Sequence, residues 1–278
     1  MAAAALATAR ALVVLTLAAA ALPALAASQP WRHGTDLAPI FERMVERRLD
    51  VPDFERAAYA ERLDAAFAQA GIALTRPQYV LLVDRDPNVQ AAFVYWRDEG
   101  GRWHFIGAAP VSTGRRGGFE YFLTPVGVFA HTLADPDFRA EGTRNEFGVR
   151  GYGERGMRVF DFGWVMGERT WDGGRSPMRL QVHATDPELL EPWLGEARSK
   201  GCIRIPASLN RLLDRYGLLD ADYEEALARG ARLWVLAPDR TPTPWPGRYL
   251  VVVDSGRSAR PTWSPPPRAR PTPEAGDC

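Results

Sequence analysis

The most informative part of the sequence is Val182-His183-Ala184-Thr185, followed by Ser199-Lys200-Gly201-Cys202-Ile203-Arg204-Ile205-Pro206. His183 ends an apolar run that predicts a strand, and Cys202 follows it by nineteen positions. A free cysteine has a pKa of about 8.5, so a thiol that attacks an amide near neutral pH needs a neighbouring base or cation. The pattern therefore predicts Cys202 as a nucleophile and His183 as its base.

Gly201 directly precedes the cysteine and permits a tight turn. Such a turn is expected to leave the backbone N–H groups of Gly201 and Cys202 available to hold an oxyanion. The alternative for His183 and Cys202 is a hydrogen-bonded core histidine beside a buried, inert thiol, which is the common state of isolated residues of these types.

Short apolar segments separated by turn residues dominate the chain from Gln78 to Leu236 and predict a mostly-β domain of the α+β class. The first three of these segments are expected to form a β-meander. We expect strands at 78–83, 91–96, 103–111, 128–132, 178–183 and 232–237, and helices at 207–216 and 221–229.

A helical pattern precedes the strands, between Asp36 and Gly71. Val51-Pro52-Asp53 separates two short helices, and Pro52 with Asp53 suits the start of the second. We expect the two helices to form a hairpin that caps the main domain. The sequence is therefore divided into a helical N-terminal extension at 27–76 and a catalytic domain at 77–238.

The two ends of the chain have compositions of their own. Residues 1–26 combine Arg10 with an apolar run and small residues at the cleavage position, which is typical of a signal peptide that is removed. An uncleaved anchor is the alternative, but the run is shorter than the roughly 20 residues that a membrane span needs. Residues 239–278 are rich in proline and predict an extended or disordered tail, except for 249–253, which we expect to be an edge strand.

The composition argues against several classes of protein. The 34 basic and 34 acidic residues give a formal net charge of zero, so binding to nucleic acid is not indicated. No apolar run after the signal peptide is long enough for a membrane span, so no stable membrane insertion is expected after cleavage. Only Cys202 and Cys278 are present, which argues against a disulfide scaffold, and no spacing of histidines, cysteines and acids predicts a metal site.

Residues 178–206 resemble the YkuD-type L,D-transpeptidases, whose signature is a histidine in an I-H-G-T-like strand followed by S-H-G-C-I-R. Residues 111–114 and 124–129 look like the upstream segments of that family, so the resemblance covers residues 78–237. Two positions depart from the family pattern. Lys200 stands where the family has a histidine, and Ala184 follows the base where the family has a glycine.

The resemblance implies a β-sandwich catalytic domain that needs no cofactor and no metal. It makes Cys202 the acylated nucleophile, His183 the base, and the carbonyl of Ala184 the acceptor that orients the imidazole. The implied substrates are donor and acceptor stem peptides of peptidoglycan, which the enzyme would cross-link in the periplasm. The implied link joins two third-position residues, or L-alanine to diaminopimelate as in proteobacterial relatives with a proline-rich C-terminal region.

Three residues next to the nucleophile are assigned to substrate binding, namely Ser199, Lys200 and Arg204. Lys200 can lower the pKa of the thiol, contact a diaminopimelate carboxylate or point into solvent. Arg204 can bind a substrate carboxylate through two parallel hydrogen bonds. Its alternative is an ion pair with an acid such as Asp186.

Three other functions compete with cross-linking. If water reaches the acyl-enzyme, the same residues give an L,D-carboxypeptidase or an endopeptidase. A peptidoglycan-binding module without catalysis is less favoured, because a binder needs neither Cys202 nor His183. A papain-like peptidase is least favoured, since its cysteine precedes its histidine in the chain.

Overall fold

The structure is a computed structural model that describes residues 31–267. The predicted signal peptide at 1–26 and Cys278 lie outside the described residues, as does the end of the proline-rich tail. Within the described range, no helix is both long and apolar enough to cross a bilayer.

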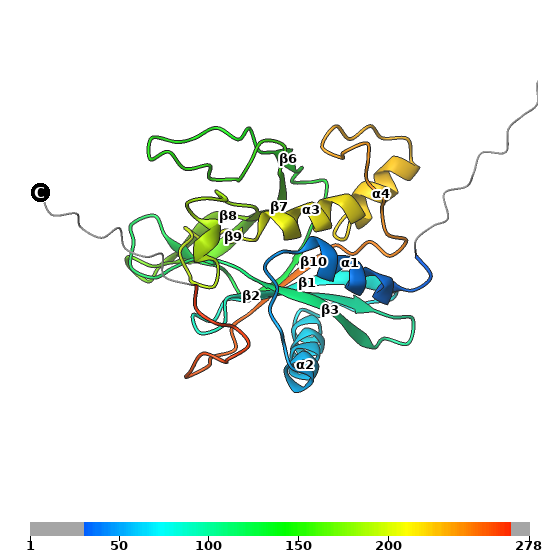
Figure 1. Ribbon diagram of the computed structural model, residues 1–278, viewed down its shortest axis with the longest axis horizontal. Coiled ribbons are helices and arrows are strands. Elements are labelled where there is room, and N and C mark those ends of the chain that lie inside the picture. Colours follow the sequence, from blue (N-terminus) through cyan, green and yellow to red (C-terminus); the bar gives the residue numbers. More distant parts are fainter. Residues whose placement is uncertain (1–30, 268–278) are drawn as a thin grey trace, which may run out of the picture. The chain divides into compact units, whose positions relative to one another are not determined.

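The first sheet has five strands in the order β3-β2-β1-β10-β5 (Figure 1). The strands are β1 (Gln78–Asp84), β2 (Ala91–Arg97), β3 (Trp103–Pro110), β5 (Gly127–Ala130) and β10 (Tyr249–Val253). Strands β1, β2 and β3 pair antiparallel in sequence order, which confirms the predicted meander. Strand β10 pairs with β1 in parallel and with β5 antiparallel.

Residues 249–253 therefore form an interior strand, and the prediction of an edge strand was wrong. The physical reason lies in the segment itself, because Leu250 and Val252 are buried in one core of the protein while Val251 and Val253 are buried in another. An apolar run without alternation is typical of a strand that is covered on both faces.

The second sheet has the order β4-β7-β8-β9, with the short β6 pairing with β7. The strands are β4 (Phe122–Leu123), β6 (Phe138–Arg139), β7 (Arg158–Arg169), β8 (Arg175–His183) and β9 (Ile203–Arg204). Side chains alternate along β8, so Met178, Leu180 and Val182 enter the core between the two sheets. Arg179, Gln181 and His183 consequently lie on the opposite, outer face of this sheet.

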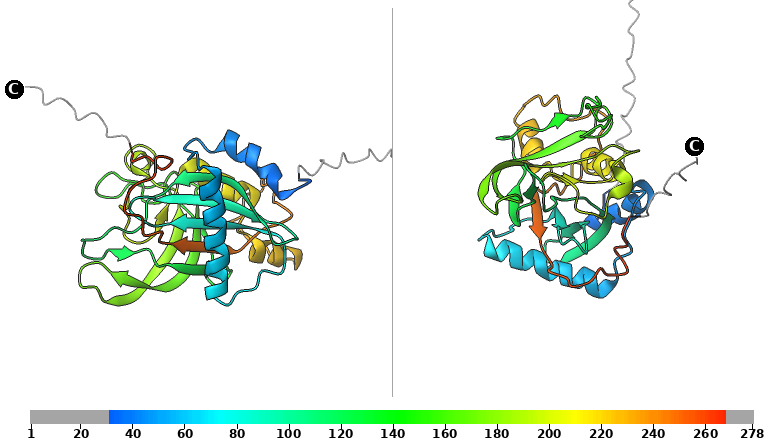
Figure 2. Two further views of the ribbon diagram at one scale, coloured as in Figure 1. Left: turned by 90° about the horizontal axis from the view of Figure 1, so that it is seen from below. Right: turned by 90° about the vertical axis from the view of Figure 1, so that its left-hand side faces the viewer.

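The helices cover the first sheet from both sides (Figure 2). They are α1 (Leu37–Met44), α2 (Asp53–Gln69), α3 (Ala207–Tyr216) and α4 (Ala221–Ala228), with short 3₁₀ helices at η1 (Gly34–Asp36) and η2 (Glu191–Trp193). Helix α1 packs against β3 and α3 in the core that also holds the second sheet. Helix α2 packs on the other side, against β5 and β10.

The two N-terminal helices thus contribute to different cores and do not form the predicted hairpin. Leu37 and Phe41 belong to the core between the sheets, whereas Tyr59, Leu63 and Phe67 belong to the core beneath α2. The apolar face of each helix was predicted correctly, but the two faces are buried against different surfaces of the first sheet. The coarse prediction of a sheet-rich α+β fold is confirmed.

Two further segments differ from expectation. Residues 232–237 contain no strand, because the backbone carbonyl of Val235 accepts hydrogen bonds from the guanidinium of Arg139 and Trp234 is 76% exposed. Residues 254–267 lack helix and strand yet are packed on the domain. There, the indole of Trp263 donates to Glu55 and the hydroxyl of Ser264 donates to the carbonyl of Val89.

Candidate active site

The parallel pairing of β8 with β9 brings the two predicted catalytic residues together. Val182 lies opposite Ile203 and His183 lies opposite Arg204 in this register. Cys202 directly precedes β9, and its Sγ lies 3.6 Å from the carbonyl oxygen of Arg179 on β8. The pairing of these two strands brings together residues that lie nineteen positions apart in the sequence. The side chains of His183 and Cys202 both lie at the outer face of the second sheet.

His183 is held as a neutral base. Its side chain is 4% exposed, and Nδ1 lies 2.5 Å from the carbonyl oxygen of Ala184. Because a carbonyl only accepts, Nδ1 carries the proton and Nε2 keeps its lone pair. Burial lowers the pKa of His183 to about 4, and the nearby charge of Arg204 acts in the same direction. The imidazole is therefore unprotonated at neutral pH and able to take a proton at Nε2.

The thiol of Cys202 is protonated in this arrangement. Burial raises the pKa of the thiol, and Asp161 adds to the effect, while a backbone hydrogen bond from Gln181 and the charge of Arg204 oppose it. Two acceptors lie near the single S–H proton, the carbonyl oxygen of Arg179 at 3.6 Å from Sγ and Oε1 of Gln181 at 4.0 Å. Within residues 31–267 no hydrogen bond joins Sγ to the imidazole, so the resting pair is a neutral thiol and a neutral base.

Tyr152, which the sequence analysis missed, completes the surroundings of the base. Its ring packs edge-on against His183 with centroids 4.7 Å apart, and its hydroxyl donates to Oε1 of Gln181 at 3.0 Å. The loop that carries it lines a pocket of about 600 Å³ together with Trp234. No sequence motif marks this tyrosine. Gln181 could have been found, since it is a polar residue two positions before the base on the same face of an apolar strand.

The turn before the nucleophile is fixed by Ser199. Its hydroxyl donates to the carbonyl of Cys202 at 2.5 Å and accepts the N–H of Gly201 at 3.0 Å. Gly201 has φ +132°, and a Cβ there would lie 2.7 Å from the side chain of Met178, so this position requires glycine. The N–H of Gly201 thus already has a partner, which argues against its predicted role in holding an oxyanion. Ser199 is 1% exposed, which argues against its predicted contact with substrate.

The Lys200 side chain lies at the surface, paired with an acid. Its ammonium lies 3.3 Å from Oε2 of Glu120, with the two side chains 60% and 65% exposed, and it approaches the ring of Tyr121. Of the three roles considered for Lys200, the geometry favours the solvent-facing one.

Arg204 is a half-buried cation without a counter-ion. No carboxylate within residues 31–267 lies at ion-pair distance from its guanidinium, and Asp186 instead accepts backbone N–H groups, including that of Arg150 at 3.0 Å. The alternative of an Arg204–Asp186 ion pair was therefore wrong. Burial lowers the pKa of Arg204, and the neighbouring Cys202 and Tyr121 counteract this. A cation in this state can bind a carboxylate or stabilise negative charge beside the thiol.

Comparisons with known proteins give little beyond this geometry. No family model matches the sequence, and no curated protein matches it. Solved structures that are similar include the helical cell shape determining protein Pgp2 from Campylobacter jejuni, at 16% identity and a TM-score of 0.32, with 68% of this chain and 51% of that chain covered. A mutant of Pgp2 gives 14% identity, a TM-score of 0.32 and coverages of 69% and 52%. This chain thus spans about half the length of those structures, and we assign neither family nor activity from a similarity of this degree.

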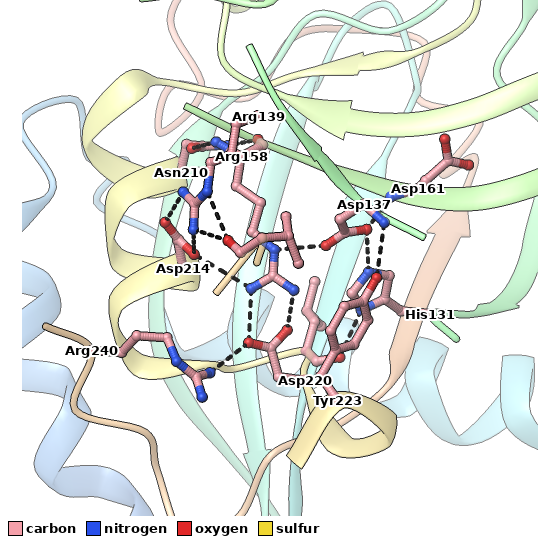
Figure 3. Close-up of polar contacts among 12 residues, drawn as sticks. His131, Asp137, Arg139, Arg158, Asp161, Asn210, Asp214, Asp220, Tyr223 and Arg240 are labelled. Carbon is pink, nitrogen blue, oxygen red and sulfur yellow. Dashed lines mark hydrogen bonds and ion pairs between the residues drawn. The ribbon is translucent and has the colours of Figure 1, made fainter. Parts of the chain in front are cut away.

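A buried network of charges lies behind the site (Figure 3). Arg158 is fully buried and pairs with Asp137 at 2.6 Å and with Asp220 at 2.7 Å. His131 lies 2.7 Å from Asp137. Burial opposes the charged form of His131, but the Asp137 carboxylate outweighs it and raises the pKa. The network reaches the site through Asp161, whose backbone N–H donates to Asp137.

Proposed function

We propose that this protein is a cysteine-dependent L,D-transpeptidase that cross-links peptidoglycan stem peptides in the periplasm. The observation that carries the proposal is the parallel register of β8 and β9. It places a thiol, a buried neutral imidazole and a guanidinium without a counter-ion on one face of a sheet. If the thiol were inert and the histidine only structural, there would be no reason for the thiol, the neutral imidazole and the unpaired guanidinium to lie together.

The chemistry follows from the protonation states. The Cys202 side chain turns from the carbonyl of Arg179 towards the imidazole of His183, Nε2 takes the thiol proton, and Sγ attacks the carbonyl carbon of a donor stem peptide. The imidazolium then returns this proton to the leaving amine, which departs as the thioester forms. In the second step, the amine of an acceptor stem attacks the thioester, and His183 takes a proton from that amine. The C–S bond then breaks, His183 returns the proton to Sγ of Cys202, and the cross-linked product leaves as an amide.

Arg204 binds a carboxylate of the substrate. Stem peptides carry carboxylates, and the guanidinium is placed beside the thiol with its donors unpaired by any acid of residues 31–267. Desolvation makes such a cation a stronger partner for a carboxylate than a solvated lysine. This argument favours Arg204 over Lys200 as the group that holds the donor or the acceptor.

The proposal is tested with disaccharide-peptide muropeptides and mass spectrometry. The mature chain is compared with Cys202→Ala, and Cys278→Ser serves as the matched control because it removes the only other thiol. A cross-linked dimer that forms with the control but not with Cys202→Ala supports transpeptidation. Fragmentation of the dimer locates the link at position one or at position three of the donor.

Two other outcomes have definite meanings. Shortened monomers without dimers, dependent on Cys202, mean that water takes the place of the acceptor amine and that the protein is an L,D-carboxypeptidase or endopeptidase. The absence of any Cys202-dependent product, with purified muropeptides still retained by the protein, overturns catalysis in favour of a binding module.

A further inference from the structure

One oxygen atom of the Gln181 side chain lies beside the thiol of Cys202 and also accepts the hydroxyl of Tyr152, the neighbour of His183. Oε1 accepts the hydroxyl of Tyr152 at 3.0 Å, and the thiol of Cys202 lies 4.0 Å from the same atom. Tyr152 in turn packs its ring against His183. The orientation of this single amide therefore affects the nucleophile directly and the base through the tyrosine.

Asp161 determines which way the amide faces. Its Oδ2 lies 2.7 Å from Nε2 of Gln181, and both side chains are nearly inaccessible to solvent. An ionised carboxylate only accepts, so the NH₂ group of Gln181 has to face Asp161 and the carbonyl oxygen has to face the thiol. The opposite orientation would place two acceptor oxygens against each other in a site shielded from water.

The carboxylate itself is held by two donors besides the amide. Oδ1 accepts the N–H of Gly163 at 2.9 Å, and Oδ2 also accepts Nε of Arg179 at 2.8 Å. The backbone N–H of Asp161 donates to Asp137, which belongs to the buried ionic network in Figure 3. Asp161 therefore has little freedom to turn, and the orientation that it imposes is built into the core.

We infer that Asp161 is a positioning residue, which fixes the Gln181 amide with its oxygen towards Cys202 and so holds the nucleophile as a protonated thiol between attacks. The inference rests on the proposed role of Cys202 as nucleophile. An acceptor oxygen beside the sulfur favours S–H over the thiolate, and the charge of Asp161 acts in the same direction. The thiol is released only when it turns from the amide to the imidazole.

Other charged or titratable groups that face the thiol come from every neighbouring element. They are Tyr152 from the loop before β7, Arg179 and His183 from β8, and Arg204 from β9. Arg204 favours the thiolate and opposes Asp161. The carboxylate of Asp161 and the oxygen of Gln181 are thus the groups that a substitution can change without removing either catalytic residue.

The test measures the pH dependence of Cys202 alkylation by iodoacetamide, followed by intact-mass spectrometry. All variants carry Cys278→Ser, so that one thiol is observed. Asp161→Asn removes the charge and lets the Gln181 amide turn its NH₂ group to the sulfur. The alkylation midpoint should then fall by about one pH unit, which makes the reaction at neutral pH roughly tenfold faster. Gln181→Glu puts a second acid beside the sulfur, and its midpoint should rise.

Asp135→Asn is the matched control. Asp135 pairs with the same Arg179, at 3.2 Å, but does not contact the Gln181 amide. Its alkylation profile should stay within a few tenths of a pH unit of the parent. Equal shifts in Asp135→Asn and Asp161→Asn, or shifts of the same sign in Asp161→Asn and Gln181→Glu, overturn the inference.

Misfolding is distinguished by a second readout. Thermal unfolding identifies variants that have lost the fold, and these would show the midpoint of an exposed cysteine, about 8.5, in both substitutions alike. Should Asp161→Asn fail to fold, Gln181→Glu and Gln181→Met still decide, since only the acid should raise the midpoint above that of Gln181→Met. The alkylation needs no peptidoglycan, so its failure is distinct from a failure of the proposed cross-linking activity.

Discussion

His183 lies opposite Arg204 in the parallel register that joins β8 to β9. The guanidinium disfavours a positive charge on the imidazole, and burial disfavours it more strongly. A base that stays neutral well below its usual pKa suits a nucleophile that is itself a neutral thiol at rest. The pair differs in this respect from a preformed thiolate–imidazolium ion pair, and the difference has measurable consequences.

Protonation of His183 should destabilise the protein in mild acid. The unfolded chain binds this proton near pH 6.5 and the folded protein only near pH 4, so the unfolded state binds more protons between these values. The contribution of His183 to stability is fully present above about pH 6.5 and falls by about 3 kcal/mol as the pH drops to about 4. Urea unfolding at several pH values should therefore show a smaller acid loss for His183→Gln than for the parent. Parallel stability curves for the two proteins would contradict the buried neutral imidazole.

Two substitutions of Arg204 should distinguish the effect of its charge from the effect of its planar shape on substrate binding. Arg204→Lys keeps the charge but loses the planar fork, so KM for muropeptides should rise by roughly ten- to a hundredfold while the acidic limb of kcat/KM stays in place. Arg204→Gln removes the charge, and its acidic limb should also move to higher pH. Arg211→Gln is the control, because Arg211 is half exposed and pairs at 3.8 Å with Glu154. An unchanged KM in both Arg204 variants would remove this residue from substrate binding.

The neighbours Ser199 and Lys200 should differ sharply in their effect on turnover. Ser199→Ala leaves the N–H of Gly201 and the carbonyl of Cys202 without their buried partner, which should cost about 1 to 3 kcal/mol of stability and lower kcat. Lys200→Gln removes an exposed ion pair and should change kcat/KM less than about threefold. A larger loss in Lys200→Gln than in Ser199→Ala would show that the ammonium reaches the substrate.

The buried network should respond to loss of its central cation. Arg158→Met removes the cation between Asp137 and Asp220 and leaves His131 and Arg240 as their remaining partners, and the free energy of unfolding should fall by about 3 to 5 kcal/mol. Arg76→Met breaks an exposed pair with Glu225 and should cost less than about 1 kcal/mol. Chemical denaturation of both variants checks the contrast, which would be absent if the interior charges were well hydrated.

Truncation of the tail should have two very different results. A chain that ends after Ala237 lacks β10 and should not fold, so it cannot report on whether the tail shapes the products. A chain that ends after Ser255 keeps β10 but loses the indole of Trp263 from the core beneath α2, and should fold with a loss of about 3 to 5 kcal/mol. Circular dichroism and thermal unfolding distinguish the two. A role of the tail in product choice is then tested with the longer chain.

The proximity of Cys202 and His183 could be predicted from the sequence because their residue types and spacing are unusual together, as could strands such as 78–83 with clear turns at their ends. The surfaces against which the helices pack could not be predicted. The apolar faces of α1 and α2 were visible, but nothing in them specifies which side of a sheet they cover. The roles of Asp161 and Tyr152 depend on their contacts with Gln181, which lies twenty or more positions away in the sequence. Asp161 lies opposite Gln181 only because of the register of β7 with β8.

The interior position of β10 also constrains how the chain acquires its shape. Strands β1 and β5 are made early, yet the strand that joins them is among the last described segments to leave the ribosome. Until then each has an unpaired edge, and contacts across some 170 positions have to wait for loop closure. A partly synthesised chain can form the β1–β3 meander but not the complete first sheet, so the native topology is reached only after β10 has been synthesised.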